Sequence, residues 1–166
     1  TILIGQSTWE VEAVDIDPSN YYGVTVANGM VGLVSSAEPL KVSDVVLNGV
    51  YDNYQRGRVS NILKGFNHVD MDLDVDGHRI GRGDIQDYRQ TLDMREAKLV
   101  TTFSTDDISV THEIMALRHL PYTAMVNVTI TARKDVEITP IARIEAPDHL
   151  ADVRNLYAEI DRPHVL

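Results

Sequence analysis

Residues 69–77 read Val-Asp-Met-Asp-Leu-Asp-Val-Asp-Gly, and this stretch decides the fold class. Apolar and acidic residues alternate with a period of two, which is the pattern of a β-strand with one face in the core and a row of carboxylates in water. The closing Asp76-Gly77 pair is typical of a turn between strands. The stretch therefore predicts a half-buried strand that ends in a tight turn.

Five further runs show strand character, because they are rich in β-branched or apolar residues and are bounded by turn residues. They are Tyr22–Ala27, Met30–Ser35, Ile108–Met115, Met125–Ala132 and Val136–Ile144. Asn28-Gly29 lies between the first two runs, and both residues tolerate the positive φ that a type I′ hairpin needs. The polar segment 133–135 separates the last two runs and is as short as a hairpin turn.

One apolar stripe with helical spacing runs from Leu150 to Ile160, and the rest of the chain offers no long helical stretch. Many short strands separated by turns indicate an antiparallel β-sandwich rather than a βαβ fold. At 166 residues the chain fits one domain, and there is no linker before Pro147. The sequence thus predicts a single all-β domain over residues 1–166.

The charge and composition of the chain limit the classes of partner that we expect it to bind. The chain carries 15 Lys and Arg against 25 Asp and Glu, a net charge of −10, so we expect no nucleic-acid partner. No apolar run approaches the roughly 18 residues that span a membrane, which predicts no membrane partner. There is no Cys, and hence no disulfide framework. The sequence starts at Thr1 without an initiator Met, so the compartment stays open between the cytoplasm and, after removal of a signal, the periplasm or the exterior.

Two short matches to metal-site motifs fail at the position that matters. Asp72 opens like a calcium loop, but the twelfth loop position is Gly83, which has no carboxylate. His112 opens like a zinc-protease helix, yet Ala116 stands where the second His belongs. We therefore expect no metal ion and no cofactor, and we interpret the carboxylates of residues 70–76 as a solvated strand face.

The most informative segment covers residues 84–95 and reads Asp-Ile-Gln-Asp-Tyr-Arg-Gln-Thr-Leu-Asp-Met-Arg. It resembles the Asp-Tyr-Arg-x-x-Leu-Asp-Met-Arg signature in the N-terminal domain of glycoside hydrolase family 65, the maltose, trehalose and kojibiose phosphorylases and their hydrolytic relatives. Three upstream features stand in the order that the family shows, namely segments 27–32, 48–52 and 70–77. The motif residues are Asn28, Gly29, Gly32, Tyr51, Asp52, Asp87, Tyr88, Arg89, Leu92, Asp93, Met94 and Arg95.

Two segments depart from the family pattern. After Gly32 the family usually continues with Arg-Gly, whereas this chain has Leu33 and Val34. The family's Asn-x-Pro-Asn-Trp loop corresponds here to Asn-Ile-Leu-Lys-Gly-Phe-Asn at residues 61–67, which has neither the Pro nor the Trp. These departures indicate a divergent branch of the family.

The resemblance implies a galactose-mutarotase-like super-sandwich, present here only in part, and after it a catalytic (α/α)₆ barrel. The parent enzyme would cleave an α-linked glucosyl disaccharide or oligosaccharide with inversion. In that reaction a carboxylic acid protonates the leaving oxygen, while water, or inorganic phosphate as co-substrate in a phosphorylase, attacks from the opposite face. Because these groups would lie in the barrel, we assign no catalytic residue to this chain and expect it to be inactive alone. The expected partners are the enzyme's own barrel and the sugar. The sequence does not decide whether the protein forms a homodimer.

The signature segment 87–95 is interpreted as structural. We expect a crossover in which apolar residues enter the core and the charged residues, half-buried or buried, satisfy one another. The charged residues are Asp87, Arg89, Asp93 and Arg95. The alternative is that one of them reaches the sugar.

If any residue of this domain touches sugar, the loop from Asn61 to His68 is the best candidate. Phe66 offers an apolar face to a pyranose ring, and Asn67 offers an amide that can make two hydrogen bonds to hydroxyls.

A free-standing carbohydrate-binding module, or an assembly domain without enzymatic activity, is the alternative function. Such modules display a surface stripe of aromatic residues. Here aromatic residues make up 6% of the chain, and Trp9 is the only Trp. The best candidates for such a stripe are Tyr21, Tyr22, Tyr51 and Tyr54.

Overall fold

The computed structural model describes residues 2–4, 9–52 and 61–146, and within these ranges the regular structure is β-strand apart from two short 3₁₀ turns, Pro18–Asn20 and Arg82–Asp84. All strand pairs are antiparallel, and they form three sheets. The predicted all-β antiparallel fold is confirmed. The expected helical stripe at 150–160 lies outside the described residues.

The largest sheet has six strands in the order β1-β2-β9-β10-β11-β12. Its strands are β1 (Ile2–Ile4), β2 (Glu10–Ala13), β9 (Gln86–Asp93), β10 (Lys98–Ser104), β11 (Ile108–Ala116) and β12 (Ala124–Ala132). The last four follow one another along the chain and are neighbours in the sheet. They therefore form a meander, and short turns are enough to connect them.

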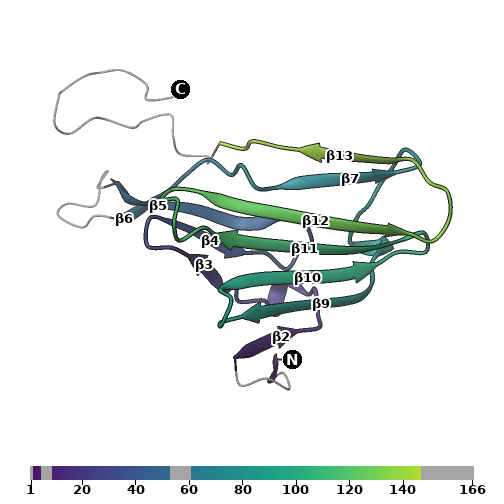
Figure 1. Ribbon diagram of the computed structural model, residues 1–166, viewed down its shortest axis with the longest axis horizontal. Coiled ribbons are helices and arrows are strands. Elements are labelled where there is room, and N and C mark those ends of the chain that lie inside the picture. The colour runs from purple at the N-terminus through teal and green to yellow at the C-terminus, as the bar shows by residue number, and fades with distance from the viewer. Residues whose placement is uncertain (1, 5–8, 53–60, 147–166) are drawn as a thin grey trace.

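Two smaller sheets lie against this one (Figure 1). The four-stranded sheet contains β3 (Thr25–Ala27), β4 (Val31–Ser35), β5 (Val42–Asp52) and β6 (Asn61–Lys64). The three-stranded sheet has the order β13-β7-β8 and contains β7 (Met71–Val75), β8 (His78–Arg79) and β13 (Ile138–Ala142).

The core consists of two apolar clusters, one under each small sheet. In the first, Leu33 of β4 and Val45 of β5 pack with Leu99 and Ile114 of the large sheet. The second joins β7 and the segment before β5 to β10 and β11, through Leu40, Leu73, Val75, Phe103, Ile108 and Val110. Each cluster thus holds one small sheet against the six-stranded sheet, which is the arrangement of a sandwich.

The stretch that decides the fold forms β7, and its turn has the predicted geometry. Leu73 and Val75 are buried. Asp76 and Gly77 both have positive φ, 50° and 77°, and they are the two loop residues between Val75 and its partner His78 in β8. This is a type I′ hairpin, as the Asp-Gly pair predicts.

The hairpin at Asn28 differs from its prediction. Gly29 has a φ of 89°, but Asn28 does not have positive φ, so the turn is not type I′. Instead the Asn28 side-chain oxygen accepts hydrogen bonds from the backbone N–H groups of Met30 and Val31, each at 2.9 Å. The side chain replaces a backbone turn, which is an alternative that Asn offers at such positions.

Segment 133–135 is not a hairpin turn. It leads from β12, at the edge of the large sheet, to β13, which pairs with β7 in the three-stranded sheet. Composition predicts the turn residues but cannot say which strand comes next to which, because pairing depends on contacts far apart in the sequence.

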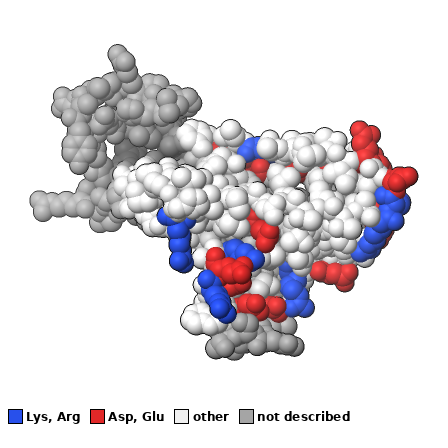
Figure 2. Space-filling view, in the orientation of Figure 1, with Lys and Arg blue, Asp and Glu red and all other residues white. Residues whose placement is uncertain are grey.

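Charged side chains of both signs lie beside one another on the face shown in Figure 2. Among the residues that the structure describes, no helix is long and apolar enough to cross a membrane.

Candidate functional site

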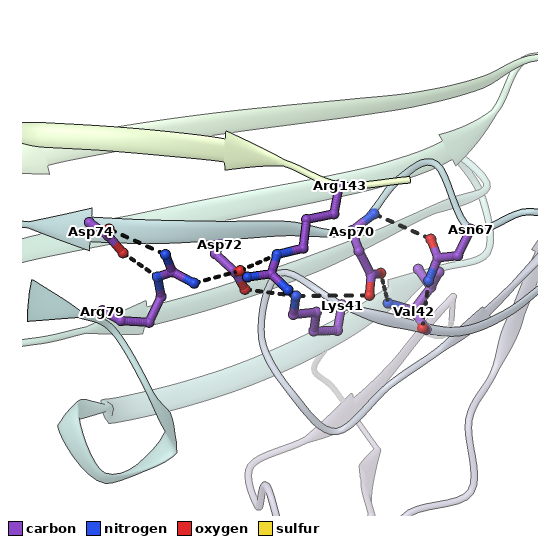
Figure 3. Close-up of polar contacts among 8 residues, drawn as sticks. All are labelled: Lys41, Val42, Asn67, Asp70, Asp72, Asp74, Arg79 and Arg143. Carbon is purple, nitrogen blue, oxygen red and sulfur yellow. Dashed lines mark hydrogen bonds and ion pairs between the residues drawn. The ribbon is translucent and has the colours of Figure 1, made fainter. Parts of the chain in front are cut away.

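The densest polar constellation lies along the acidic strand β7 and is shown in Figure 3. Asp70, just before the strand, is only 6% exposed, and its carboxylate accepts a 2.7 Å hydrogen bond from the backbone N–H of Val42. The Lys41 ammonium stands 4.0 Å away. Burial raises the pKa of the Asp70 carboxyl, although the Val42 and Asn67 hydrogen bonds and Lys41 act in the opposite direction.

Asp72 is surrounded by three cations. Its carboxylate lies 2.8 Å from Lys41 Nζ, 2.8 Å from Arg79 Nη1 and 2.5 Å from Arg143 Nε. The Arg79 guanidinium also reaches Asp74 with its Nε, so that one arginine bridges two carboxylates of the strand. The hydrogen bond from Lys41 holds the pKa of Asp72 below its usual range, and the hydrogen bond from Arg79 does the same for Asp74.

The interpretation of these carboxylates as a solvated face is therefore wrong for Asp70 and Asp72. Asp72 is 13% exposed, because Arg143, just beyond β13, and Lys41, just before β5, cover it. Lys41 and Arg143 come from segments distant in the chain, which a local sequence pattern does not reveal, whereas Arg79 comes from the other strand of the hairpin. The described residues hold no group of three or more His, Cys, Asp or Glu side chains that could bind a metal ion. The constellation is an ion-pair clamp, here defined as Asp70, Asp72, Asp74, Lys41, Arg79 and Arg143.

An acid catalyst needs a raised pKa and access to substrate. Asp70 meets the first condition, but its carboxylate is buried beneath Lys41 and bonded to Val42. The other carboxylates of the clamp have lowered pKa values. The contacts of the clamp hold segments of the domain together.

The segment predicted to be a loop near substrate, Asn61 to His68, is in part a strand, because residues 61–64 form β6 and only residues 65–68 follow it. Asn67 forms a backbone bridge with Glu145, and its side-chain oxygen accepts bonds from the N–H groups of Val69 and Asp70. Its amide NH₂ donates to the Val42 carbonyl. The amide of Asn67 thus serves the turn that leads into the acidic strand.

The side chains next to Asn67 in the sequence are less involved in contacts within the domain. Phe66 is half-buried, and His68 is exposed, with Nδ1 3.1 Å from the Phe66 carbonyl oxygen. Asn61 begins β6 and pairs with Asp52 at the end of β5, and Tyr51 pairs with Ile62. A sugar contact by any of these residues stays a prediction.

The signature segment is a strand of the large sheet and not a crossover. Residues 86–93 form β9, between β2 and β10, and the chain then turns back through Ala97, which has a φ of 56°. Tyr88 and Leu92 are half-buried and pack against the two core clusters, as predicted, whereas Met94 is 46% exposed. The Tyr88 hydroxyl is buried without a hydrogen-bond partner among the described residues, and burial raises its pKa.

The charged residues of the signature do not pair with one another. Arg89 is 53% exposed and forms a 2.6 Å ion pair with Glu12 of β2. Asp87 accepts a hydrogen bond from the Ser104 hydroxyl, and Asp93 accepts the backbone N–H groups of Arg95 and Glu96 in the turn. Asp87, Arg89 and Asp93 are separated by even numbers of residues and therefore share the outer face of β9, but each takes its partner from a neighbouring strand or turn.

The upstream motif residues have local structural roles. Gly32 lies in β4, where a Cβ atom would come 3.0 Å from a methyl group of Val46 in β5. The Asn28 amide donates to the Leu117 carbonyl at 2.8 Å. This bond joins the turn between β3 and β4 to the loop between β11 and β12.

A buried polar row was not predicted from the sequence. Gln90, Thr101 and His112 occupy matching positions on β9, β10 and β11, and all three are buried. Gln90 donates to the Thr101 hydroxyl at 3.1 Å, and its side-chain oxygen accepts from the Tyr21 hydroxyl. The same Tyr21 hydroxyl lies 2.5 Å from that of Ser35. This row separates the two apolar clusters.

His112 ends the polar row. It is 1% exposed, and its Nε2 has no hydrogen-bond partner among the described residues. Burial lowers its pKa to about 4, so the ring is neutral at pH 7. The period-two spacing of β11 places His112 on the apolar face of the strand. This spacing was the feature of the sequence from which its burial could have been predicted.

A shallow hollow opens beside the other end of this row. Leu92, Leu99 and Val24 are among its lining residues, with the exposed Tyr22. Its volume is about 100 Å³.

The described fold and its motifs agree with one known domain type. Residues 23–165 match the profile of the glycosyl hydrolase family 65 N-terminal domain. The chain belongs to glycosyl hydrolase family 65. The resemblance seen in the sequence is thereby confirmed.

Two relatives are similar to this family 65 domain over nearly its whole length. A kojibiose hydrolase from Mucilaginibacter mallensis is 46% identical over 95% of the chain, and a kojibiose hydrolase from Flavobacterium johnsoniae is 43% identical over 98%. In both cases the aligned part is 24% of the relative's own length. The chain therefore spans about a quarter of the length of these relatives.

Proposed function

We propose that this family 65 domain is the non-catalytic N-terminal sandwich of an enzyme that hydrolyses kojibiose or a closely related α-linked glucosyl disaccharide. The observation that carries the proposal is the identity of 46% and 43% to two proteins named kojibiose hydrolase. Both alignments cover almost all of the chain. Among the family activities that the resemblance allowed, hydrolysis is therefore favoured over phosphorolysis, and water rather than phosphate is the attacking group.

The geometry supports a non-catalytic role. Inverting hydrolysis needs an acid and a base about 6.5–9.5 Å apart, with sugar and water between them. The carboxylates of the clamp face Lys41, Arg79 and Arg143 instead of an open cleft. Catalysis is thus assigned to a helical barrel in the part of the enzyme that corresponds to the remaining length of the relatives.

The loop 65–68 is the part of this domain that we place nearest to the substrate. Its exposed His68 and half-buried Phe66 keep groups free for a sugar, whereas the Asn67 amide is used within the domain. In the longer enzyme, Phe66→Ala should raise KM for kojibiose about 2- to 10-fold and leave kcat unchanged, as expected for lost aromatic contact. An unchanged KM would remove the loop from the substrate site.

The activity is tested with the longer enzyme and kojibiose, with and without inorganic phosphate. Proton NMR follows the anomeric signals during the reaction. The expected products are two glucose molecules, with β-glucose appearing first from the inverted unit, and phosphate has no effect on the rate. Formation of glucose 1-phosphate, or a requirement for phosphate, would replace hydrolysis by phosphorolysis.

A further inference from the structure

The hollow beside Tyr22 combines an apolar bottom with a polar, exposed edge. Leu99 is buried, and Leu92 and Val24 are half-buried, so the bottom is carbon-rich. Tyr22 is 90% exposed, which leaves its ring and its hydroxyl accessible. Asp15 and Asn20 are also exposed lining residues. A largely apolar hollow with a few converging polar groups is the usual composition of a small-ligand site.

The lining carboxylates differ in how far the protein itself uses them. Glu12 pairs with Arg89 at 2.6 Å. Asp17 caps the 3₁₀ turn by accepting from the Ser19 backbone and hydroxyl, which lowers its pKa. Asp15 accepts one bond on Oδ1, from the Asp17 N–H, and no described residue donates to its Oδ2. One carboxylate oxygen therefore remains available to a ligand.

These free groups match a sugar. A pyranose ring has an apolar C–H face, which can lie on Tyr22, and an edge of hydroxyls that both donate and accept hydrogen bonds. Asp15 Oδ2 can accept from a sugar hydroxyl, and the Tyr22 hydroxyl can donate or accept. The Asn20 amide already donates one N–H to Asp17 at 3.3 Å, which leaves its carbonyl oxygen and its second N–H for a ligand.

Size limits the ligand to one ring. The volume of about 100 Å³ is below the roughly 300–1,000 Å³ of sites that enclose drug-sized molecules. We propose that this hollow, defined by Tyr22, Asp15, Asn20 and Leu92, binds a single glucosyl unit at a site separate from the loop 65–68. The choice of glucose among sugars rests on the proposed function.

The test is a titration of the isotope-labelled chain with D-glucose, kojibiose and L-arginine, followed by amide chemical shifts. Both sugars should shift the amides around Ala13, Asn20, Tyr22 and Leu92, with a dissociation constant in the millimolar range, as expected for so small a contact. Tyr22→Ala should weaken binding about fivefold or more. Because Tyr22 is exposed, this change does not threaten the fold. The matched control is Tyr122→Ala, which removes another exposed Tyr and should bind as the unmodified chain does.

Three results would overturn the site. They are an absence of shifts up to about 50 mM sugar, wild-type binding by Tyr22→Ala, and tighter binding of arginine than of either sugar, which would make the hollow a dock for a basic side chain. Glucose is a product and is not turned over, so its binding does not depend on the hydrolase activity. A titration without binding would therefore not contradict the proposed hydrolase function. Equally, an enzyme without hydrolase activity would not prevent the titration from being interpreted.

Discussion

Asp70 and Arg89 show how burial decides what a charged residue contributes. Asp70 is buried and receives a backbone hydrogen bond, whereas Arg89 is half in solvent with one ion-pair partner. Exposed ion pairs contribute about 0–1 kcal/mol, while a buried group left without its partner costs about 1–3 kcal/mol. The two side chains should therefore respond very differently to removal.

We expect Arg89→Ala to cost about 0–1 kcal/mol and Asp70→Ala about 2–3 kcal/mol, since the latter leaves the Val42 N–H without an acceptor. Asp70→Asn should cost less than Asp70→Ala, because the amide keeps an acceptor and the folded protein already disfavours the charge. Urea unfolding midpoints at unchanged slope provide the comparison. A loss at Arg89→Ala as large as that at Asp70→Ala would restore the signature as a buried ion network.

His112 predicts a pH dependence of stability. Its pKa is about 4 in the folded chain and 6.5 when unfolded, so the unfolded state binds a proton first as the pH falls. Stability from this group is complete above pH 6.5 and declines toward pH 4, by about 3 kcal/mol in total. His112→Leu should remove this decline, and at pH 7 it should cost little, because Nε2 has no described partner to lose.

The measurement for His112 is urea unfolding of both proteins between pH 7 and pH 4.5. The difference between the two free energies of unfolding isolates His112 from the other titrating groups. As the pH falls, the free energy of unfolding of the variant should rise relative to that of the unmodified chain. Parallel curves for the two proteins would show that the ring is protonated without penalty in the folded state.

At the scale of elements, the clamp holds β7 to its hairpin partner β8 and to two segments that are distant in the chain. Lys41 precedes β5, Arg79 belongs to β8 and Arg143 follows β13. Asp72 is the centre that all three share (Figure 3). The acidic strand is therefore a point where three segments meet, and Asp72 is covered by their cations.

Removal of Asp72 tests this clamp. Asp72→Ala leaves three cations close together without their shared partner and should cost about 2 kcal/mol or more. Asp135→Ala is the matched control, since Asp135 is exposed, and it should cost about 0–0.5 kcal/mol. Thermal or urea unfolding at low salt measures both. Equal, small losses would mean that solvent already screens the Asp72 contacts.

Sequence patterns predict elements here better than they predict partners. Period-two spacing and turn chemistry predicted β7, β11, β12 and the Asp76-Gly77 hairpin, because these depend on neighbouring residues. The same reasoning placed 133–135 in a hairpin and the signature in a crossover, because strand pairing depends on distant contacts. It also missed β5, which contains Gly49 with a φ of 86° and whose register with β6 shifts between Val46 and Tyr51.

The candidate site follows the same division. The acidic run was visible, but its cations come from three other segments. The polar row from Tyr21 to His112 requires the register of four elements to be known. Asn67 was recognised as important, yet only the structure shows that its amide is bound within the domain.

For the whole molecule, the central claim is that a family 65 N-terminal sandwich, held by buried clusters and an ion-pair clamp, contributes structure and not bond cleavage. The two kojibiose hydrolases that it resembles are about four times longer. A free-standing binding module would also be inactive as an isolated chain. Unlike the proposed enzyme domain, it would not form part of a longer protein that becomes active through a helical barrel.

The most direct measurement is the release of glucose from kojibiose by the 166-residue chain alone. The folded chain, checked by a strand-type circular-dichroism spectrum, is incubated with kojibiose at high protein concentration, and glucose is quantified against a buffer blank. The expected result is no release above the blank, with or without phosphate. Glucose release above the blank by the folded chain would contradict the claim.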